Sequence, residues 1–417
     1  MREMKDSGIS WVGEIPKEWS VNRAKYCFVN TKEIAGCMSD RYERLALTMN
    51  GVIKRSKDDS NGLQPEKFET YQILRPDELV FKLIDLQNVS TSRVGLSPYL
   101  GLVSPAYIIL KSNKRVLPAF AEKYFLMLWK NQIFNALGDA GVRSNLNSKD
   151  LLELSIPFPT FDEHQQIADF LDRECGKIDG LKADIQAQID TLEQYKRSVI
   201  TEAVTHGLNP SAPMKDSGIP WVGQFPTHWT KKKGKYILRY MSKPVKQDDG
   251  VITCFRDGEV TLRSNRREDG FTMADKEIGY QGVDVGDLVV HGMDGFAGAI
   301  GISDSRGKAS PVLNVLNTKQ NKKYIMYYLR SMAYGEVFTA LSTGIRVRSC
   351  DLRWNKLAEL LYPLPPIDEQ NNIVSYIDNQ IARTNEIIAD KKSQIETLDG
   401  YKKSLIYEYV TGKKEVV

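Results

Sequence analysis

Two groups of basic residues could bind a nucleic acid. They lie among Asn, Ser and Gln side chains. Arg and Lys pair with phosphate oxygens or with guanine edges, while Asn and Gln match adenine. For any single residue a solvated surface is the simpler interpretation, so the clusters carry more weight than their members. The candidates are Arg41, Arg44, Lys54, Arg55, Lys57 and Arg93 in the first half, and Arg256, Arg263, Arg266, Arg267, Arg306 and Lys308 in the second.

Two further arginines recur at like places in the two halves of the chain. Arg143 ends a Gly-Val-Arg triplet and Arg346 ends a Gly-Ile-Arg triplet. A phosphate contact shared by both halves would explain them, and so would an intramolecular anchor to an acidic residue. Both interpretations stay open, and both arginines join the candidates for DNA binding.

Catalytic motifs are not found in the sequence. It has no G-x-x-x-x-G-K-[ST] loop, G-x-G-x-x-G fingerprint or H-E-x-x-H pair, and no Asn-Pro-Pro-Tyr, Asp-Pro-Pro-Tyr or Pro-Asp…Glu-x-Lys stretch. The four histidines are isolated, and the five cysteines form no C-x-x-C pair. We therefore assign no catalytic, cofactor-binding or metal-binding residue, although a methyltransferase or nuclease fused to its own reader remains the main enzyme alternative.

The elements that must position the basic clusters are organised by an internal repeat. Its first block recurs at an offset of 210 residues, and two later blocks recur at an offset of 206. This near-constant offset indicates that one unit was duplicated whole. The pairs of blocks are Met4–Gly13 with Met214–Gly223, Ile156–Glu163 with Tyr362–Glu369, and Gln188–Ser198 with Gln394–Ser404.

Between the repeated blocks the two halves diverge. Residues from Ala35 to Phe68 have no convincing counterpart in Met241 to Phe271. A duplicated enzyme would keep its active-site residues in one or both copies, whereas a duplicated reader would vary the surface that reads. The divergence therefore favours a reader, and a purely structural coiled-coil adaptor is the other alternative.

Residues 162–205 and 368–411 each predict one long helix. Both begin with Asp-Glu, which the helix dipole favours in a first turn, and both repeat apolar residues every seven positions. At 1.5 Å per residue each helix would reach about 66 Å. We expect the two helices to pair antiparallel with one globule at each end, although amphipathic helices on local cores are the simpler alternative. The seam residues are Leu171, Ile178, Ile185, Leu192, Val199, Ile381, Ile388, Ile395 and Leu398.

The globules mix short apolar runs with longer helical stretches. The runs 79–81, 106–110, 288–290 and 312–316 predict strands, and 119–137 and 322–341 predict helices. This predicts an α+β fold with two mixed domains separated by the paired helices. The expected boundaries are 1–155 for the first recognition domain, 156–208 for the first helix, 209–360 for the second recognition domain and 361–417 for the second helix.

Composition limits the class of protein. The 417 residues carry a net charge of +4, which is compatible with nucleic acid but does not require it. No apolar run approaches the roughly 20 residues that span a bilayer, and the N-terminus has no apolar signal region. We expect a cytoplasmic protein without a membrane partner.

The motifs in this order resemble the specificity subunits of Type I restriction and modification enzymes. The resemblance covers nearly the whole chain. It rests on the opening Asp6-Ser7-Gly8-Ile9 with Trp11-Val12-Gly13 and Trp19, on its copy at Asp216 to Trp229, and on the Leu-x-x-Tyr-Lys-x-Ser segments that begin at Leu192 and Leu398. The helix entry Pro-x-Pro-x-x-Asp-Glu also matches, but Gln165-Gln166 of the first copy is replaced by Asn371-Asn372 in the second.

The resemblance implies a division of labour among several chains. It implies that two target recognition domains each read half of a split site in double-stranded DNA. It also implies that the long helices bind two methyltransferase subunits and that motor-nuclease subunits join for cleavage. S-adenosylmethionine, ATP and Mg²⁺ are expected in those partners and not in this chain. A specificity module of another multi-subunit DNA methyltransferase is the alternative within this class.

Overall fold

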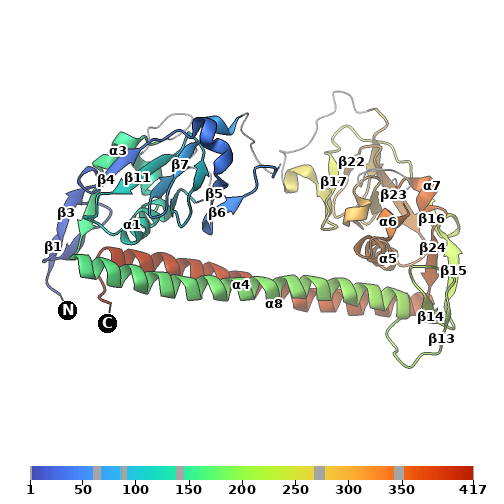
Figure 1. The fold of residues 1–417 in the computed structure, drawn as a ribbon. Helices are drawn as coiled ribbons and strands as arrows, with labels where there is room; N and C mark the ends of the chain where they lie inside the picture. Colours follow the sequence, from blue (N-terminus) through green and yellow to red (C-terminus); the bar gives the residue numbers. More distant parts are fainter. Residues whose placement is uncertain are drawn as a thin grey trace. The chain divides into compact units, whose positions relative to one another are not determined.

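The computed structural model describes residues 2–59, 67–84, 86, 92–137, 145–266, 278–341 and 352–416. The chain divides into two compact units, and each unit contains one globule with parts of both long helices. Unit 1 comprises residues 1–185 and 392–417, and unit 2 comprises residues 186–391. Figure 1 shows the two globules and the two long helices. No helix within the described ranges is long and apolar enough to cross a membrane.

Unit 1 is built on a four-stranded sheet in the order β4-β11-β8-β9, and α1 packs on its β9 edge. A second four-stranded sheet has the order β6-β5-β10-β7. The strands of unit 1 are β1 (Met4–Asp6), β2 (Glu14–Pro16), β3 (Ser20–Arg23), β4 (Phe28–Thr31), β5 (Arg44–Thr48), β6 (Gly51–Arg55), β7 (Gln72–Leu74), β8 (Leu79–Phe81), β9 (Val94–Leu96), β10 (Gly101–Val103), β11 (Ile108–Ser112) and β12 (Ser155–Phe158). Its helices are η1 (Ala24–Tyr26), η2 (Gly36–Arg41), η3 (Phe68–Thr70), α1 (Pro118–Lys130), α2 (Ile133–Leu137) and α3 (Ser148–Glu153), with α4 (Phe161–His206) continuing into unit 2.

Unit 2 repeats the first of these sheets but not the second. The order β16-β23-β20-β21 matches β4-β11-β8-β9, whereas two separate two-stranded sheets, β17-β18 and β19-β22, replace the other sheet. The strands of unit 2 are β13 (Met214–Asp216), β14 (Gln224–Pro226), β15 (Thr230–Lys233), β16 (Leu238–Tyr240), β17 (Ile252–Cys254), β18 (Val260–Leu262), β19 (Gln281–Val283), β20 (Leu288–His291), β21 (Ile300–Ile302), β22 (Gly307–Ala309), β23 (Leu313–Thr318) and β24 (Leu361–Leu364). Its helices are η4 (Gly234–Tyr236), η5 (Arg263–Asn265), η6 (Gly295–Ala297), α5 (Lys322–Tyr334), α6 (Val337–Ala340) and α7 (Trp354–Leu357), with α8 (Ile367–Val410) continuing into unit 1.

The repeated sequence blocks meet in space within each unit. In unit 1 the buried Trp19 donates its indole N–H to Oε2 of Glu163 at 2.9 Å. In unit 2 Trp229 donates in the same way to Oε1 of Glu369 at 3.0 Å. A buried indole N–H needs an acceptor, so this bond fixes the start of each long helix to its globule.

The helical segments predicted at 119–137 and 322–341 are each broken once. Gln132 has a φ of 61° and Glu336 a φ of 56°, so both lie in the left-handed region that an α-helix cannot include. Each segment is therefore two helices, α1 with α2 and α5 with α6. The four predicted strands correspond to β8, β11, β20 and β23.

The two long helices run antiparallel within each unit. In unit 1 Lys182 bonds Asp399 at 2.5 Å and Lys402 bonds Asp179 at 2.6 Å, so rising numbers on α4 meet falling numbers on α8. In unit 2 Lys391 of α8 donates to Gln188 of α4. The predicted α+β fold with two long antiparallel helices is confirmed.

Apolar seam residues join each helix pair to the globule core. All nine predicted seam residues are buried or half-buried. Leu171 and Ile178 belong to the main core of unit 1, and Ile381 packs against that of unit 2. The apolar side chains are buried between the two helices and against the globule, which explains why helices with so many charged positions are stable in this arrangement.

Candidate nucleic-acid interface

The β17–β18 hairpin of unit 2 and the turn after it carry three of the predicted DNA-binding residues. Its turn is tight, because Phe255 N–H donates to the Glu259 carbonyl at 2.8 Å and Gly258 has a φ of 92°. A Cβ at Gly258 would meet the guanidinium of Arg330, so glycine is required there. Arg256 lies in this turn, and Arg263 and Arg266 follow β18.

A pocket of about 710 Å³ opens beside this hairpin. Its charged and aromatic lining is Phe255, Arg256, Asp257, Arg263, Arg266, His291 and Asp294. The hairpin thus brings together three of the predicted arginines, which are separated by only a few residues in sequence.

The guanidinium group of Arg266 is held in one orientation in this pocket. Its guanidinium stacks at 4.1 Å on the ring of Phe255 and forms ion pairs at 2.8 Å with Asp257 and Glu259. Hydrogen bonding to Asp257 raises the pKa of Arg266, so the charge is permanent. Both terminal nitrogens of this guanidinium bond carboxylates, so a guanine edge or a phosphate would have to displace one of these exposed ion pairs.

Arg256 and His291 complete the polar lining. Arg256 is 63% exposed and pairs with Asp294 at 3.0 Å. Nδ1 of His291 accepts the main-chain N–H groups of Met293 and Asp294 at 3.2 and 2.9 Å. Burial lowers the pKa of His291, against the opposing effect of Asp294, so the ring is neutral with Nε2 protonated. His291 therefore contributes a donor to the pocket, which the sequence did not reveal.

Two other candidates in unit 2 are engaged with the protein itself. Arg306 bonds both carboxylate oxygens of Asp249 at 2.9 and 2.7 Å, pairs with Asp284, and donates to the Pro244 carbonyl. This arginine lowers the pKa of Asp249 to about 2. Arg306 is thus a structural anchor in this structure, while Lys308 is half-buried in β22 opposite Gly282.

In unit 1 the candidates gather on the β5–β6 hairpin and on η2. Lys57 donates to the Ser39 carbonyl at 2.9 Å and lies 5.5 Å from the ring of Phe68. The mostly buried Arg44 lies 5.8 Å from the same ring. Arg41 is exposed at the end of η2.

The remaining two cations on this hairpin have carboxylate partners. Lys54 pairs with Glu43 at 2.6 Å, and Arg55 pairs with Asp59 at 2.7 Å. The side chains of the Lys54 pair are 53% and 60% exposed, and such an ion pair is weak enough to be exchanged for a phosphate, whereas the Arg55 pair is half-buried.

Arg93 does not lie where a DNA contact would require it. Its side chain has no exposed surface, because it immediately precedes β9 at the edge of the main core. We therefore leave Arg93 out of the proposed interface. The predicted residues Arg143, Arg267 and Arg346 lie outside the described residues.

The chain is similar to known specificity subunits in sequence. A family model of the Type I restriction modification DNA specificity domain matches residues 84–191. The putative type I restriction enzyme MjaX specificity subunit of Methanocaldococcus jannaschii is 22% identical over 97% of this chain and 96% of its own length. The chain belongs to the family of Type I restriction-modification specificity subunits.

One solved structure shares the fold of this chain. One chain, from a study of complex assembly and conformational transition of the type I R-M system, aligns with a TM-score of 0.66 at 11% identity, covering 96% of this chain and 99% of that one. The HsdS subunit from Thermoanaerobacter tengcongensis aligns with a TM-score of 0.46 at 13% identity, covering 96% of this chain and 98% of that one. This specificity subunit is the DNA-recognition component of a Type I restriction-modification system and a non-catalytic part of its complex.

Proposed function

We propose that this specificity subunit reads a split, asymmetric site in double-stranded DNA, with one half-site read by each unit. The observation that carries the proposal is the position of the basic clusters on the parts that differ between units. Arg41 and the β5–β6 hairpin belong to the second sheet region of unit 1, and Arg256, Arg263 and Arg266 belong to the β17–β18 hairpin of unit 2. Unlike surfaces on a duplicated frame favour unlike half-sites.

The chemistry of the two hairpins supports reading of this kind. In unit 2 the stacked Arg266 and the exposed Arg256 can contact base edges or phosphates, and the neutral His291 can donate to an acceptor. In unit 1 the exposed Arg41, with Lys54 and Arg55, presents cations in a different pattern on a different sheet. Direct contacts that differ in geometry select different sequences.

We propose that the long helices dock two methyltransferase subunits on the flank that faces away from each globule. In unit 1 Asp172, which follows the seam residue Leu171, pairs with Lys123 of the globule at 2.6 Å. Leu181 and Tyr401 each precede a lysine that bonds the opposite long helix, Lys182 or Lys402, and in an antiparallel heptad pair such positions share the opposite flank. They are 53% and 58% exposed. We call Leu181 with Tyr401 the outer flank of unit 1.

Unit 2 has the same arrangement at the repeated positions. Asp378 pairs with Lys323 of the globule at 2.7 Å, while Ile387 and Tyr195 are each 47% exposed on the other flank. Tyr195 also lines an apolar groove of about 870 Å³ together with Val199, Ala203 and Tyr376. Large exposed apolar side chains kept in both copies favour two copies of one protein partner.

In this proposal the catalytic work belongs to the partners. The methyltransferase subunits would carry S-adenosylmethionine, and the motor-nuclease subunits would use ATP and Mg²⁺. This chain would supply the DNA sequence preference and the positions of its partners.

The proposal is tested by exchanging residues 20–150 for the corresponding segment of a related specificity subunit. The exchanged chain and its methyltransferase are expressed together, and methylated sites are mapped by methylome sequencing. We expect one half of the recognition sequence to change and the other to stay. A folded, active exchange that alters both halves, or a modified site that is one continuous palindrome, contradicts the proposal.

A further inference from the structure

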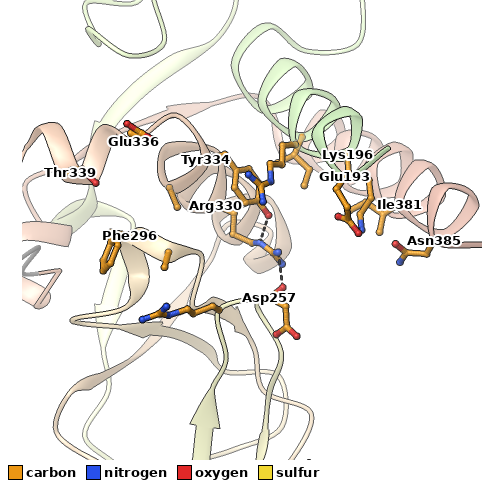
Figure 2. Close-up of a pocket in the computed structure, with 15 residues that line it drawn as sticks. Glu193, Lys196, Asp257, Phe296, Arg330, Tyr334, Glu336, Thr339, Ile381 and Asn385 are labelled. Carbon is orange, nitrogen blue, oxygen red and sulfur yellow. Dashed lines mark hydrogen bonds and ion pairs between the residues drawn. The ribbon is translucent and has the colours of Figure 1, made fainter. Parts of the chain in front are cut away.

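A second pocket in unit 2 lies between the long helices and the globule (Figure 2). It has a volume of about 810 Å³. The lining comes from α4 around Lys196, from α8 at Ile381 and Asn385, from α5, and from the β17–β18 turn. Arg256 and Asp257 line both this pocket and the hairpin pocket described above. The two pockets therefore adjoin at the β17–β18 turn.

Two guanidinium groups meet at one aromatic ring in this pocket. Arg330 donates from Nε to the hydroxyl of Tyr334 at 2.8 Å and from Nη2 to the Asp257 carbonyl at 2.7 Å, as Figure 2 shows. Arg330 lies 5.7 Å from the ring centre of Tyr334, and Arg197 lies 5.3 Å from it. Within the described part of the chain neither arginine has a carboxylate partner. Two positive charges are thus held in place without compensation.

The acidic residues of the pocket are mostly engaged elsewhere. Glu193 pairs with Lys196 at 3.0 Å, and Asp257 pairs with Arg266 at 2.8 Å. Glu336 lies beside Thr339, on the side of the pocket that α6 forms, and away from Arg330 in Figure 2. The uncompensated charge around Tyr334 therefore stays positive.

Comparison of the two repeats shows a difference in the residues that line this pocket. Lys402 in unit 1 bonds both carboxylate oxygens of Asp179 at 2.7 and 2.6 Å. The residues 206 positions away are Lys196 and Asn385, so the repeat in unit 2 has an uncharged amide where unit 1 has a carboxylate. The ion pair that joins Lys402 to the opposite helix in unit 1 is absent at these residues of unit 2, where Lys196 pairs with Glu193 of its own helix.

Helix α5 of unit 2 also carries a positive charge that the corresponding helix α1 of unit 1 lacks. The bonds from Trp11 to Tyr124 and from Trp221 to Tyr328 align α1 with α5. In that alignment Arg330 corresponds to Leu126, and it is the only charged residue of α5 after the first turn. A charge introduced into an otherwise apolar and aromatic helix, next to a lost carboxylate, indicates a ligand of negative charge.

We propose that this pocket binds one phosphate group of the DNA backbone, next to the bases read by the β17–β18 hairpin. The inference rests on the proposed function, because it assumes that DNA lies on this hairpin. Paired arginines fit the oxygens of a phosphate, and Tyr334 keeps both guanidinium groups oriented. Unit 2 thereby gains a phosphate contact that its repeat in unit 1 does not make through the corresponding residues. A free phosphate has the same chemistry and is distinguished by the experiment.

The test measures DNA affinity of the full chain in complex with its methyltransferase as a function of salt concentration. Each phosphate contact contributes about 0.9 to the slope of log affinity against log salt. We expect Arg330→Gln and Arg197→Gln each to reduce this slope by about 1 or less. Asn385→Asp should reduce it as well, because it restores the carboxylate that unit 1 has at Asp179.

Two matched controls accompany these variants. Lys403→Gln removes a charge at the position that corresponds to Arg197 in the other repeat, and Asn379→Asp adds a carboxylate to the same helix as Asn385, outside the pocket lining. Both residues are exposed, and both variants should keep the wild-type slope. Equal slopes for wild type and the pocket variants, or equal losses in the controls, would overturn the inference.

Ethylation interference then identifies the phosphate. With wild type we expect one backbone phosphate beside a single half-site whose ethylation weakens binding, and with Arg330→Gln that interference should disappear. If inorganic phosphate binds the pocket while the ethylation pattern of the two proteins is the same, the DNA assignment is wrong. If wild type shows no salt-dependent DNA binding at all, the proposed function fails, which is a different result from a wild type that binds and variants that do not differ.

Discussion

His164, in the first turns of α4, predicts a specific dependence of stability on pH. Its side chain is fully buried, with ring centres of Phe120 at 4.6 Å, Phe158 at 5.2 Å and Phe161 at 6.5 Å. Neither ring nitrogen has a hydrogen-bond partner among the described residues. Burial lowers the pKa of His164 to about 4. An unperturbed histidine titrates near 6.5, so the folded and unfolded states bind protons differently.

The sign and size of the effect follow from this difference. Because the folded pKa is the lower one, protonation favours the unfolded chain, and stability is lost as pH falls from about 6.5 towards 4. At about 1.36 kcal/mol per pKa unit, the full loss is about 3.4 kcal/mol, and about 2 kcal/mol of it should already be lost at pH 5. Above about pH 7 the contribution is complete.

The perturbation is His164→Phe, which extends the surrounding aromatic cluster with a side chain that cannot titrate. Hydrogen exchange on peptides from α1 and the start of α4 reports the opening of unit 1 separately from unit 2. The opening free energies of wild type and variant are compared at pH 7.5 and pH 5. The difference between the two proteins should change by about 2 kcal/mol in favour of the variant on going to pH 5. Other histidines, including the half-buried His291, are present in both proteins and cancel.

The control is His206→Gln, which changes a histidine that is 39% exposed at the end of α4. It should leave the pH dependence of unit 1 as in wild type. An equal pH dependence in wild type and His164→Phe would show that His164 is hydrated or hydrogen-bonded in solution, and the reasoning from its burial would be wrong.

Three other predictions concern partners, the hairpin and activity. Tyr401→Ala should weaken methyltransferase binding at the outer flank of unit 1, and Tyr195→Ala at the corresponding flank of unit 2, by about tenfold or more, since burying such a side chain is worth about 1.5–3 kcal/mol. Gln394→Ala, at an exposed residue one heptad before Tyr401, should not weaken binding, and titration of the partner by light scattering or calorimetry measures this. Gly258→Ala should destabilise the β17–β18 hairpin by about 1–2 kcal/mol and lower DNA affinity, because its φ of 92° disfavours a Cβ and Arg330 occupies the space, and unchanged melting and affinity would contradict it. The purified chain should neither methylate nor cut DNA when given S-adenosylmethionine or ATP, and radiolabelled methyl transfer by the chain alone would exclude the division of labour.

Several parts of the site could not be predicted from sequence, for identifiable physical reasons. Arg93 and Arg306 looked like surface cations, but burial of the first and ion pairing of the second depend on segments distant in the chain. Arg330 and Tyr334 looked like parts of a core helix, and the only signal was a single charge in a run of apolar and aromatic residues. The acceptor geometry of His291 arises from a turn after β20 that no pattern indicated.

The sequence by itself determined the elements whose signal is local or repeated. The heptads around Leu171 and Ile388 define the long helices, because an apolar residue at every seventh position is typical of a helix that packs along one side. The recurrence of Trp19 as Trp229 defines the duplication. Only the tertiary structure decided which side chains meet. It showed that each tryptophan bonds the glutamate at the start of its long helix, that the second sheet differs between units, and that Arg197 and Arg330 share one tyrosine. The tryptophan–glutamate bonds and the contact of Arg197 with Tyr334 join residues more than 100 positions apart, and no periodicity along the chain encodes the distance between them.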